Sequence, residues 1–575
     1  MIRLKKMMAL VIALVMVVCT MNMGIFAATG DLKADQKITI TGLDKGDVVH
    51  LYQVLVWEDS VGWRLNGGEQ GVYSSLLSNA NIKKLIDNDA NGGNPVELTK
   101  ADVDAVATAA KNGGTDAEID TSEPLTGDTY TFTATTPGMF LALVTPGKAG
   151  VVYNPIIVSA DFSATPNTSE INASSATMGD TAVAKKKKIT VDKHGEVMDE
   201  AVEETATEEE KIAAESTHSV GDIVKFTIET QIPAYSDAYT GPTFSVTDTL
   251  TNGLKIVVDD DHKFNVSSGS VTYTGTPANG ATSFTLDFTS ADIAALVNYQ
   301  DVVIEYYAII DSNAVSNVNE MENTVEVEFS NDPHNDGSKG KIKDKTKHYT
   351  FTIDGELLGK ENFRIIELLK VGKNADGTDA IEEITVSNGT KAAALDGALF
   401  GLYKTRKGAE DEDDDDLYTN DLFNGKVETD MGGLLVIKGL DAGTYYLKEL
   451  DAPDGFIRDT EVYEIVIDAD ITEQEVKEKI DGYEVTYSVP VLNGYTITIN
   501  GHDVTNETTY TASITGSETL EVIEPEESTT QIANTKGVEL PATGGMGTTI
   551  FYVIGTVLVL GAGILLVTRR RMNMN

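Results

Sequence analysis

The chain has 575 residues, 41% of them hydrophobic, and a formal net charge of −46 at pH 7. This length predicts several domains, each large enough to bury its own core. A surface this acidic repels phosphate groups, which excludes nucleic acid and anionic lipid as partners.

Residues 1–27 predict a secretory signal peptide. Three basic residues precede an apolar run over residues 7–18, and the small residues Ala27 and Ala28 follow it. We expect cleavage after Ala27. Cys19 is the only cysteine of the chain, so the mature protein is expected to form no disulfide. A lipid anchor at Cys19 is disfavoured because bulky residues precede it.

The first segment of the mature chain, residues 28–184, predicts a domain of strands with short helices. Helical stretches are expected over residues 76–86 and from Thr99 to about residue 110. Thr99 is followed three residues later by Asp102, which is a capping-box pattern. A polar linker is expected near the end of this segment.

The second and third segments, residues 185–358 and 359–536, alternate between apolar and polar residues and are divided by turn residues. The predicted fold class is therefore mainly β, with three tandem immunoglobulin-like β-sandwich domains, the first of which carries short helices. Residues 410–416 are seven consecutive acids. They predict a solvated loop, because no glycine-punctuated calcium loop surrounds them.

Three polar side chains of the third segment share strand faces with apolar residues, which aims them at the core: Lys370, Glu449 and Asn534. Burying them unpaired would cost several kcal/mol each. Burial favours a neutral amine and a protonated acid. Lys370 could then attack the side-chain amide of Asn534, polarised by Glu449, and release ammonia to leave a neutral amide. The alternative is an ordinary ion pair between Lys370 and Glu449.

Three strings of this segment resemble the B-type collagen-adhesin (CnaB) domain of Gram-positive pilins: LDGALFGLYK (395–404), GTYYLKELDAPDGF (443–456) and IANTKGVELPATGG (532–545). The resemblance implies an isopeptide bond between Lys370 and Asn534, with Glu449 as the catalytic acid.

The middle segment shows a similar pattern at Lys193, Asp248 and Asn323, each in register with apolar neighbours. Its strings SVGDIVKFTIETQIP, FSVTDTL and MENTVEVEFSND resemble the middle domains of pilin shafts. The resemblance implies a bond between Lys193 and Asn323, with Asp248 in place of the glutamate. Lys188 and Lys225 compete for the lysine role, and a plain sandwich without a bond is the alternative. The first segment shows no comparable triad.

Residues 537–575 predict a sorting signal. An uncharged run over residues 550–568 is long enough to form a transmembrane helix, and a basic tail follows it. Just upstream stand five residues of an LPXTG motif: Leu540, Pro541, Ala542, Thr543 and Gly544. The composite resembles the sortase cell-wall sorting signal, which implies cleavage after Thr543 and transfer of its carbonyl to an amine. A plain membrane anchor with a chance match is the alternative.

An exposed lysine would receive the Thr543 carbonyl if subunits are joined. Shaft pilins usually carry it in a Tyr-Pro-Lys-Asn motif, which is absent here. Lys185, Lys186 and Lys187 lie at the expected domain junction and are the candidate acceptors. The alternative is a basic linker that only binds acidic neighbours.

The resemblances predict a structural subunit of a covalently polymerised pilus. Its expected partners are a sortase, other pilin subunits and the peptidoglycan cross-bridge. The alternative is a wall-anchored adhesin or minor pilin that binds host surface ligands. An enzyme is disfavoured, because the seven histidines show no metal-ligand spacing and no catalytic motif is present. No cofactor and no metal site are expected.

Overall fold

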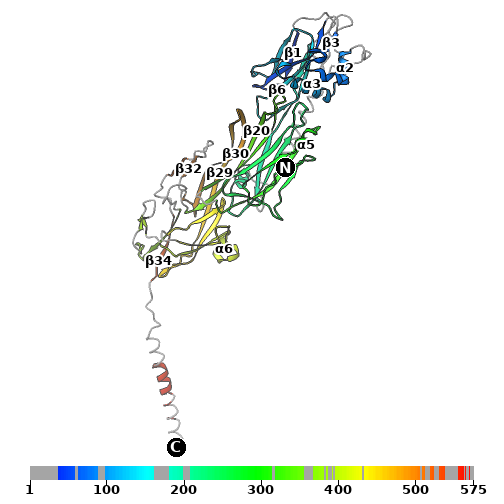
Figure 1. Ribbon diagram of the computed structural model, residues 1–575. Helices are drawn as coiled ribbons and strands as arrows, with labels where there is room; N and C mark the ends of the chain where they lie inside the picture. The colour runs from blue at the N-terminus through cyan, green and yellow to red at the C-terminus, as the bar shows by residue number, and fades with distance from the viewer. Residues whose placement is uncertain are drawn as a thin grey trace.

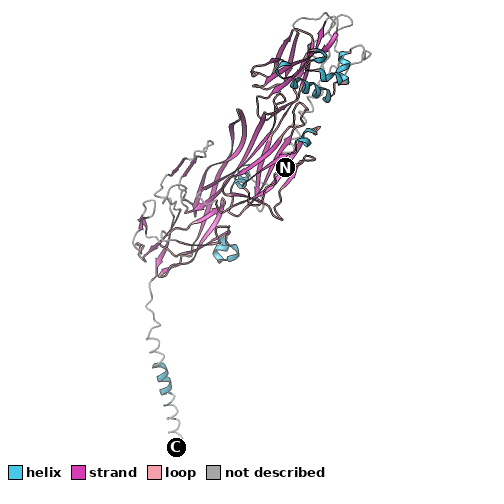
Figure 2. Ribbon diagram, viewed as in Figure 1, coloured by secondary structure: helices cyan, strands magenta, loops and turns pink. Residues whose placement is uncertain are grey.

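The computed structural model describes residues 36–537 and 554–569, with gaps at 59–61, 88–97, 161–179, 198–207, 314–317, 355–366, 381–383, 386–390, 393–394, 430–432, 505–507, 512–518, 523–529, 563 and 565–568. The predicted signal peptide and the LPXTG residues Leu540 to Gly544 lie outside these ranges. Figure 1 shows an elongated molecule with its first domain at one end, and Figure 2 shows that strands make up most of it.

The first domain is built on two main sheets. One orders β5 (Tyr130–Ala134), β1 (Gln36–Thr41) and β9 (Thr181–Val183). The other orders β3 (Gly62–Leu65), β2 (Val48–Glu58), β6 (Gly138–Thr145) and β8 (Ile156–Ala160), with β4 (Glu118–Thr121) also against β2. A short ribbon pairs β7 (Val151–Tyr153) with β10 (Lys186–Lys188).

Both predicted helical stretches of the first domain are present. The second is α3 (Lys100–Asn112), and Thr99 and Asp102 form the expected capping box at its start. The first stretch is divided. A 3-10 helix, η3 (Ser74–Ser78), ends before Asn79, whose side chain caps α2 (Ala80–Ile86). Two further 3-10 turns are η2 (Gly68–Gln70) and η5 (Gly114–Asp116).

The middle domain is a sandwich of two antiparallel sheets. One orders β11 (Val191–Val197), β12 (Ile223–Ile232), β18 (Gln300–Ile310) and β14 (Leu254–Val257), with β15 (Asn265–Ser267) also against β18. The other orders β16 (Tyr273–Thr274), β17 (Ser283–Phe288), β13 (Phe244–Leu250), β19 (Val318–Ser330) and β20 (Lys339–Ile353). The helices are α4 (Glu208–Ser216) and α5 (Ser290–Ala294).

The third domain pairs its first and last strands. The small sheet orders β21 (Leu368–Lys373), β34 (Thr530–Lys536) and β28 (Phe456–Ile457). The large sheet orders β25 (Lys426–Glu428), β24 (Leu399–Tyr403), β27 (Gly443–Asp451), β29 (Val462–Ile480), β30 (Tyr483–Ile499) and β31 (His502–Asp503). Two ribbons complete it: β22 (Ile384–Thr385) with β23 (Lys391–Ala392), and β32 (Thr508–Thr511) with β33 (Thr519–Val522).

The acidic run 410–416 is mostly exposed, as predicted, but it is not an irregular loop. It closes α6 (Arg406–Asp411) and forms the 3-10 turn η6 (Asp414–Asp416). The Asp416 carboxylate accepts hydrogen bonds from the backbone N–H and hydroxyl of Thr405, which holds the two turns together.

Strand β20 belongs to two domains. It closes the second sheet of the middle domain, yet its end pairs with β26 (Ile437–Leu440), which comes from the third segment. Tyr349, Phe351 and Ile353 of β20 are fully buried in the hydrophobic core of the third domain. The long hairpin β29–β30 also runs back along β20 (Figure 1). The predicted division at residues 358 and 359 stays a prediction, because a single sheet crosses from one segment to the next.

The carboxyl end beyond the third domain is only partly described. Residues 554–562 are helical. No helix within the described ranges is both long and apolar enough to cross a bilayer, and the predicted transmembrane span 550–568 is incompletely covered by those ranges.

The sharing of β20 predicts that a substitution in the second segment destabilises the third domain. Phe351→Ala should lower the free energy of unfolding by about 3–5 kcal/mol, because it opens a cavity in the third core. Denaturant unfolding followed by limited proteolysis would locate the loss. Lys345→Ala on the same strand is the control, since Lys345 makes a partly exposed ion pair with Glu322, outside the third core, whose loss should cost about 1 kcal/mol. If the third domain resists the protease equally well in both variants, the shared core is contradicted.

Candidate functional site

The third domain brings Lys370, Glu449 and Asn534 together. Lys370 lies on β21 and Asn534 on β34, two strands that run side by side in parallel with Lys370 opposite Ile532. Glu449 reaches the pair from β27 in the other sheet. All three residues have an exposed fraction of 0%. The alternation of side chains along each strand, which predicted that these groups point inward, is the reason they meet.

Glu449 lies between the amine and the amide. Its Oε1 is 3.4 Å from the Lys370 Nζ, and its Oε2 accepts a hydrogen bond from the Asn534 Nδ2 at 2.9 Å. The backbone N–H of Asp459 donates to the same Oε2 at 2.7 Å. The Asn534 Nδ2 also donates to the Ile457 carbonyl at 2.6 Å, which leaves the Asn534 Oδ1 without a hydrogen bond.

The surroundings of Lys370 favour a neutral amine. Burial lowers the pKa of Lys370, and the neighbouring Glu449 only partly opposes this. The Nζ lies 5.3 Å from the centre of the Phe400 ring and makes no hydrogen bond. A neutral amine, a carboxamide and a carboxyl group between them are the components needed for amide exchange with proton transfer.

The middle domain holds a second buried cluster. Lys193 on β11 forms an ion pair with Asp248 on β13, and both side chains have no exposed surface. Asn323 on β19 is also fully buried. Burial lowers the pKa of Lys193 and raises the pKa of Asp248, so both groups are driven toward their neutral forms.

Tyr306 on β18 links the members of this second cluster, and sequence reasoning missed it. Its hydroxyl donates to the Asp248 Oδ1 at 3.0 Å and accepts from the Asn323 Nδ2 at 2.6 Å. The Lys193 Nζ lies 3.0 Å from the Tyr306 hydroxyl oxygen. The available signal was its parity, because Val302, Ile304, Tyr306 and Ala308 face the core together.

The competing lysines of the middle domain lie elsewhere. Lys225 forms an ion pair with Glu305 at 2.5 Å, and its side chain is 26% exposed. Lys188 is exposed on β10. Neither is placed against Asp248 or Asn323, whereas Lys193 is.

The candidate acceptor lysines occupy three different environments at the junction of the first and middle domains. Lys185 is exposed. Lys186 forms an ion pair with Asp44 at 2.6 Å. Lys187 is half-buried, its Nζ lies 3.9 Å from the centre of the Tyr299 ring, and burial lowers its pKa.

The chain leaves the third domain beside its last strand. Just after β34 the backbone N–H of Gly537 donates to the Gly455 carbonyl at 2.8 Å. In Figure 1 this strand lies at the end of the body away from the first domain. The LPXTG residues follow a few positions later and lie outside the described residues.

Two family models match parts of the chain. A SpaA model described as a prealbumin-like fold domain matches residues 383–480, and a model of the LPXTG cell wall anchor motif matches residues 533–573. The first match contains Glu449, and the second contains Asn534 and all five LPXTG residues.

The chain is also similar to known surface proteins. It is 27% identical over 490 residues to the trypsin-resistant surface T6 protein of Streptococcus pyogenes serotype M6, covering 77% of this chain and 81% of that protein. Among solved structures, the three-domain T6 backbone pilin of the same serotype matches with a TM-score of 0.51 and 18% identity, over 88% of this chain and 99% of that one. The major pilin SpaD of Corynebacterium diphtheriae matches with a TM-score of 0.42 and 18% identity, over 80% and 99% of the two chains.

These comparisons confirm the predicted mainly β, multidomain fold and the cell wall anchor motif at the carboxyl end. The protein is a surface protein attached to the cell wall. The comparisons leave the individual bond-forming and acceptor residues as predictions.

The geometry of the third-domain cluster predicts the effect of losing its acid. Glu449→Ala should lower the free energy of unfolding by about 3–5 kcal/mol, because it strands a buried amine and a buried amide without their shared partner. Scanning calorimetry would measure the change. Glu461→Ala, an exposed acid near the same strand, is the control and should leave the transition within about 0.5 kcal/mol. If Glu449→Ala unfolds with the same free energy as the wild type, the role assigned to Glu449 is contradicted.

Proposed function

We propose that this wall-anchored pilin is the repeating subunit of a pilus shaft and that internal isopeptide bonds lock its middle and third domains. A sortase and other pilin subunits are its partners. The observation that carries the proposal is the convergence of three fully buried polar side chains from the first, an inner and the last strand of a domain whose tail carries the sorting motif.

The proposed reaction in the third domain begins with the neutral amine of Lys370. The Nζ attacks the Asn534 Cγ, and a new C–N bond forms. The Nζ proton passes to the Glu449 Oε1, which faces the amine. The Glu449 carboxyl group, which is in contact with the Asn534 Nδ2, then passes this proton on to that nitrogen. The bond from Cγ to Nδ2 breaks and ammonia leaves, so a single carboxyl group serves both proton transfers.

The middle domain has the components for the same reaction. Asp248 lies beside Lys193, and the Tyr306 hydroxyl connects Asp248 to the Asn323 amide at 3.0 and 2.6 Å. We propose that Asp248 takes the proton from Lys193 and that Tyr306 relays a proton to the leaving nitrogen. The products in both domains are neutral, which removes the cost of burying charge.

The placement of the proposed bonds suits a chain under tension. In the polymer, force enters at an acceptor lysine and leaves at Thr543. Lys193 follows the acceptor lysines closely, and Asn534 precedes Thr543 closely. Each bond would therefore carry force from an early strand directly to a late strand and bypass the rest of its domain. Each would also stabilise its domain by about 5 kcal/mol through the entropy of the unfolded chain.

Lys187 is the proposed acceptor of the Thr543 carbonyl. Its amine is the least well hydrated of the three candidates, and its lowered pKa increases the neutral fraction that can attack the sortase thioester. The Lys186 amine is engaged in an ion pair with Asp44. The wall cross-bridge amine would replace Lys187 at the base of the fibre, where polymerisation ends.

The second candidate function is a wall-anchored adhesin or minor pilin that binds host surface ligands. The first domain, with α2 and α3 on its surface, would be the binding region. This function needs the anchor but no acceptor lysine, so polymerisation separates it from the shaft pilin.

Intact-mass spectrometry tests the internal bonds. The secreted chain, residues 28–543, should be lighter than its sequence mass by two ammonia molecules. We expect one isopeptide bond in each of the single variants Asn534→Ala and Asn323→Ala, and none in the double variant. Asn493→Ala, an exposed asparagine of the third domain, should keep both. A wild-type mass equal to the mass calculated from the sequence would show that neither isopeptide bond forms. The attachment to the cell wall would be unaffected by that result.

Immunoblots of cell-wall extracts test the polymer. The wild type should give a ladder of high-mass species, and Lys187→Arg should collapse it to a single band, because the guanidinium keeps the charge but cannot attack. Lys188→Arg on the same strand should keep the ladder. A ladder that survives Lys187→Arg but not Lys185→Arg or Lys186→Arg assigns a different lysine. A single band in the wild type favours the adhesin.

A further inference from the structure

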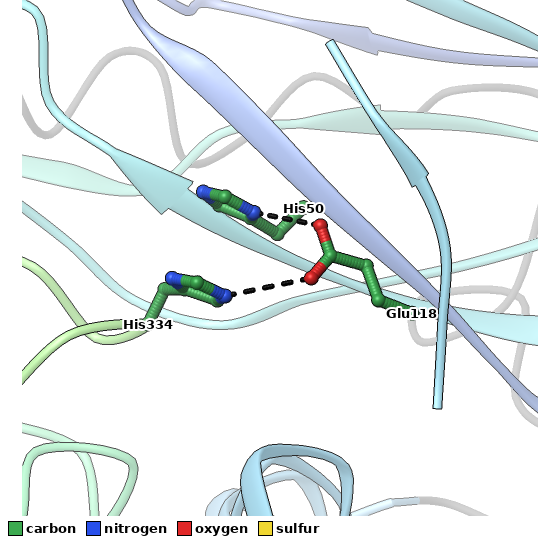
Figure 3. Close-up of side chains that lie close together, drawn as sticks. All are labelled: His50, Glu118 and His334. Atoms are coloured by element: carbon green, nitrogen blue, oxygen red, sulfur yellow. Dashed lines mark hydrogen bonds and ion pairs between the residues drawn. The ribbon is translucent and has the colours of Figure 1, made fainter. Parts of the chain in front are cut away.

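Two histidines and a glutamate from different domains meet at the junction of the first and middle domains. His50 lies on β2, Glu118 on β4, and His334 in the turn between β19 and β20. Figure 3 shows the two imidazole rings stacked in parallel, each facing one oxygen of Glu118. The ring centres are 3.6 Å apart at an interplanar angle of 5°. One ligand atom from each residue lies within 4.8 Å of the others.

A chain of hydrogen bonds defines which nitrogen of His50 carries its proton. The Asp332 carboxylate accepts from the backbone N–H of His334 and from the Thr145 hydroxyl, both at 2.8 Å. Since the Thr145 proton is used there, its oxygen accepts from the His50 Nε2 at 3.1 Å. The hydrogen of a neutral His50 is therefore on Nε2.

The other nitrogen of His50 and the carboxylate oxygen that it faces are then both hydrogen-bond acceptors. Its Nδ1 presents a lone pair to the Glu118 Oε1 at 2.8 Å. Two acceptors at this distance repel unless a cation lies between them. The His334 Nε2 is 3.5 Å from the other oxygen of the same carboxylate.

We propose that His50, Glu118 and His334 bind one divalent transition-metal ion, with zinc as the preferred occupant, and that the ion fastens the first domain to the middle domain. Two imidazoles and a carboxylate are a common zinc ligand set, and water would complete the tetrahedron. The path from His50 through Thr145 to Asp332 has the form of the outer hydrogen bonds that orient a metal-bound histidine.

Binding requires a small local rearrangement that this site can make. Zinc holds its nitrogen and oxygen ligands at about 2.0–2.2 Å, and the lone pair of an imidazole lies in the ring plane. One ring must therefore turn out of the parallel stack. His334 is suited to this, because it stands in a turn and its side chain is 31% exposed, whereas the side chains of His50 and Glu118 are 12% and 10% exposed.

No sequence motif indicates this site. The three ligands are far apart in the chain and come from two domains, so no short spacing connects them. The proposal is independent of the pilus function, since it concerns only the joint between two domains.

Calorimetric titration of zinc into the chelator-stripped chain 28–543 tests the proposal. The chain must carry no histidine tag. We expect one zinc per chain, a loss of affinity of at least about tenfold in His334→Ala and Glu118→Gln, and no change in His502→Ala, an exposed histidine of the third domain. Zinc should raise the melting temperature of the wild type but not of His334→Ala.

A second measurement does not depend on the folding of any variant. Cobalt bound to the wild type should show the intense visible absorption of a tetrahedral site, and zinc should abolish it. Wild-type protein that binds neither metal would show that only a proton separates His50 from Glu118, which overturns the proposal. Undiminished binding in His334→Ala would overturn it equally, because the ion would then lie elsewhere.

Discussion

The desolvation of Lys370 is the constraint on which the third domain depends. An amine with no exposed surface, close to a phenylalanine ring and without a hydrogen bond, is expensive to bury as a cation. The domain offsets this free-energy cost by placing the carboxyl group of Glu449 and the carboxamide of Asn534 near the Lys370 amine. This requirement explains the pairing of the first and last strands, because the parallel contact of β21 with β34 brings both Lys370 and Asn534 into contact with the Glu449 carboxyl group.

The middle domain meets the same constraint in a different way. The Lys193 amine also lies 5.3 Å from the centre of a phenylalanine ring, that of Phe226. Its acid is an aspartate, which is shorter by one methylene, and the Tyr306 hydroxyl spans the remaining distance to Asn323. Two sheets of different strand order thus converge on one local chemistry: a buried amine, an acid and an amide.

Most of what could be predicted came from the alternation of side chains between the two faces of each strand. It placed Lys370, Glu449 and Asn534 inward because each alternates with apolar residues on a single strand, and local capping chemistry located the start of α3 at Thr99. The two-domain role of β20 could not be read in this way. Its second half reads as a strand in either domain, and the partner strand β26 comes from residues 437–440, far along the chain. Tyr306 was missed because a tyrosine among apolar residues is usually only a core side chain.

The joint between the first and middle domains is built differently from the joint between the middle and third. The latter is a continuous sheet with a shared core, so it is stiff by construction. The former includes the ion pair of Lys111 with Asp336 and the histidine cluster, together with Val152 and Ala238, each of which is buried in the core of the neighbouring domain. In the proposed polymer the first domain precedes the acceptor lysines and lies outside the path of force. The proposed metal link, which is reversible, would be sufficient there, whereas the two domains under tension would need the proposed covalent bonds.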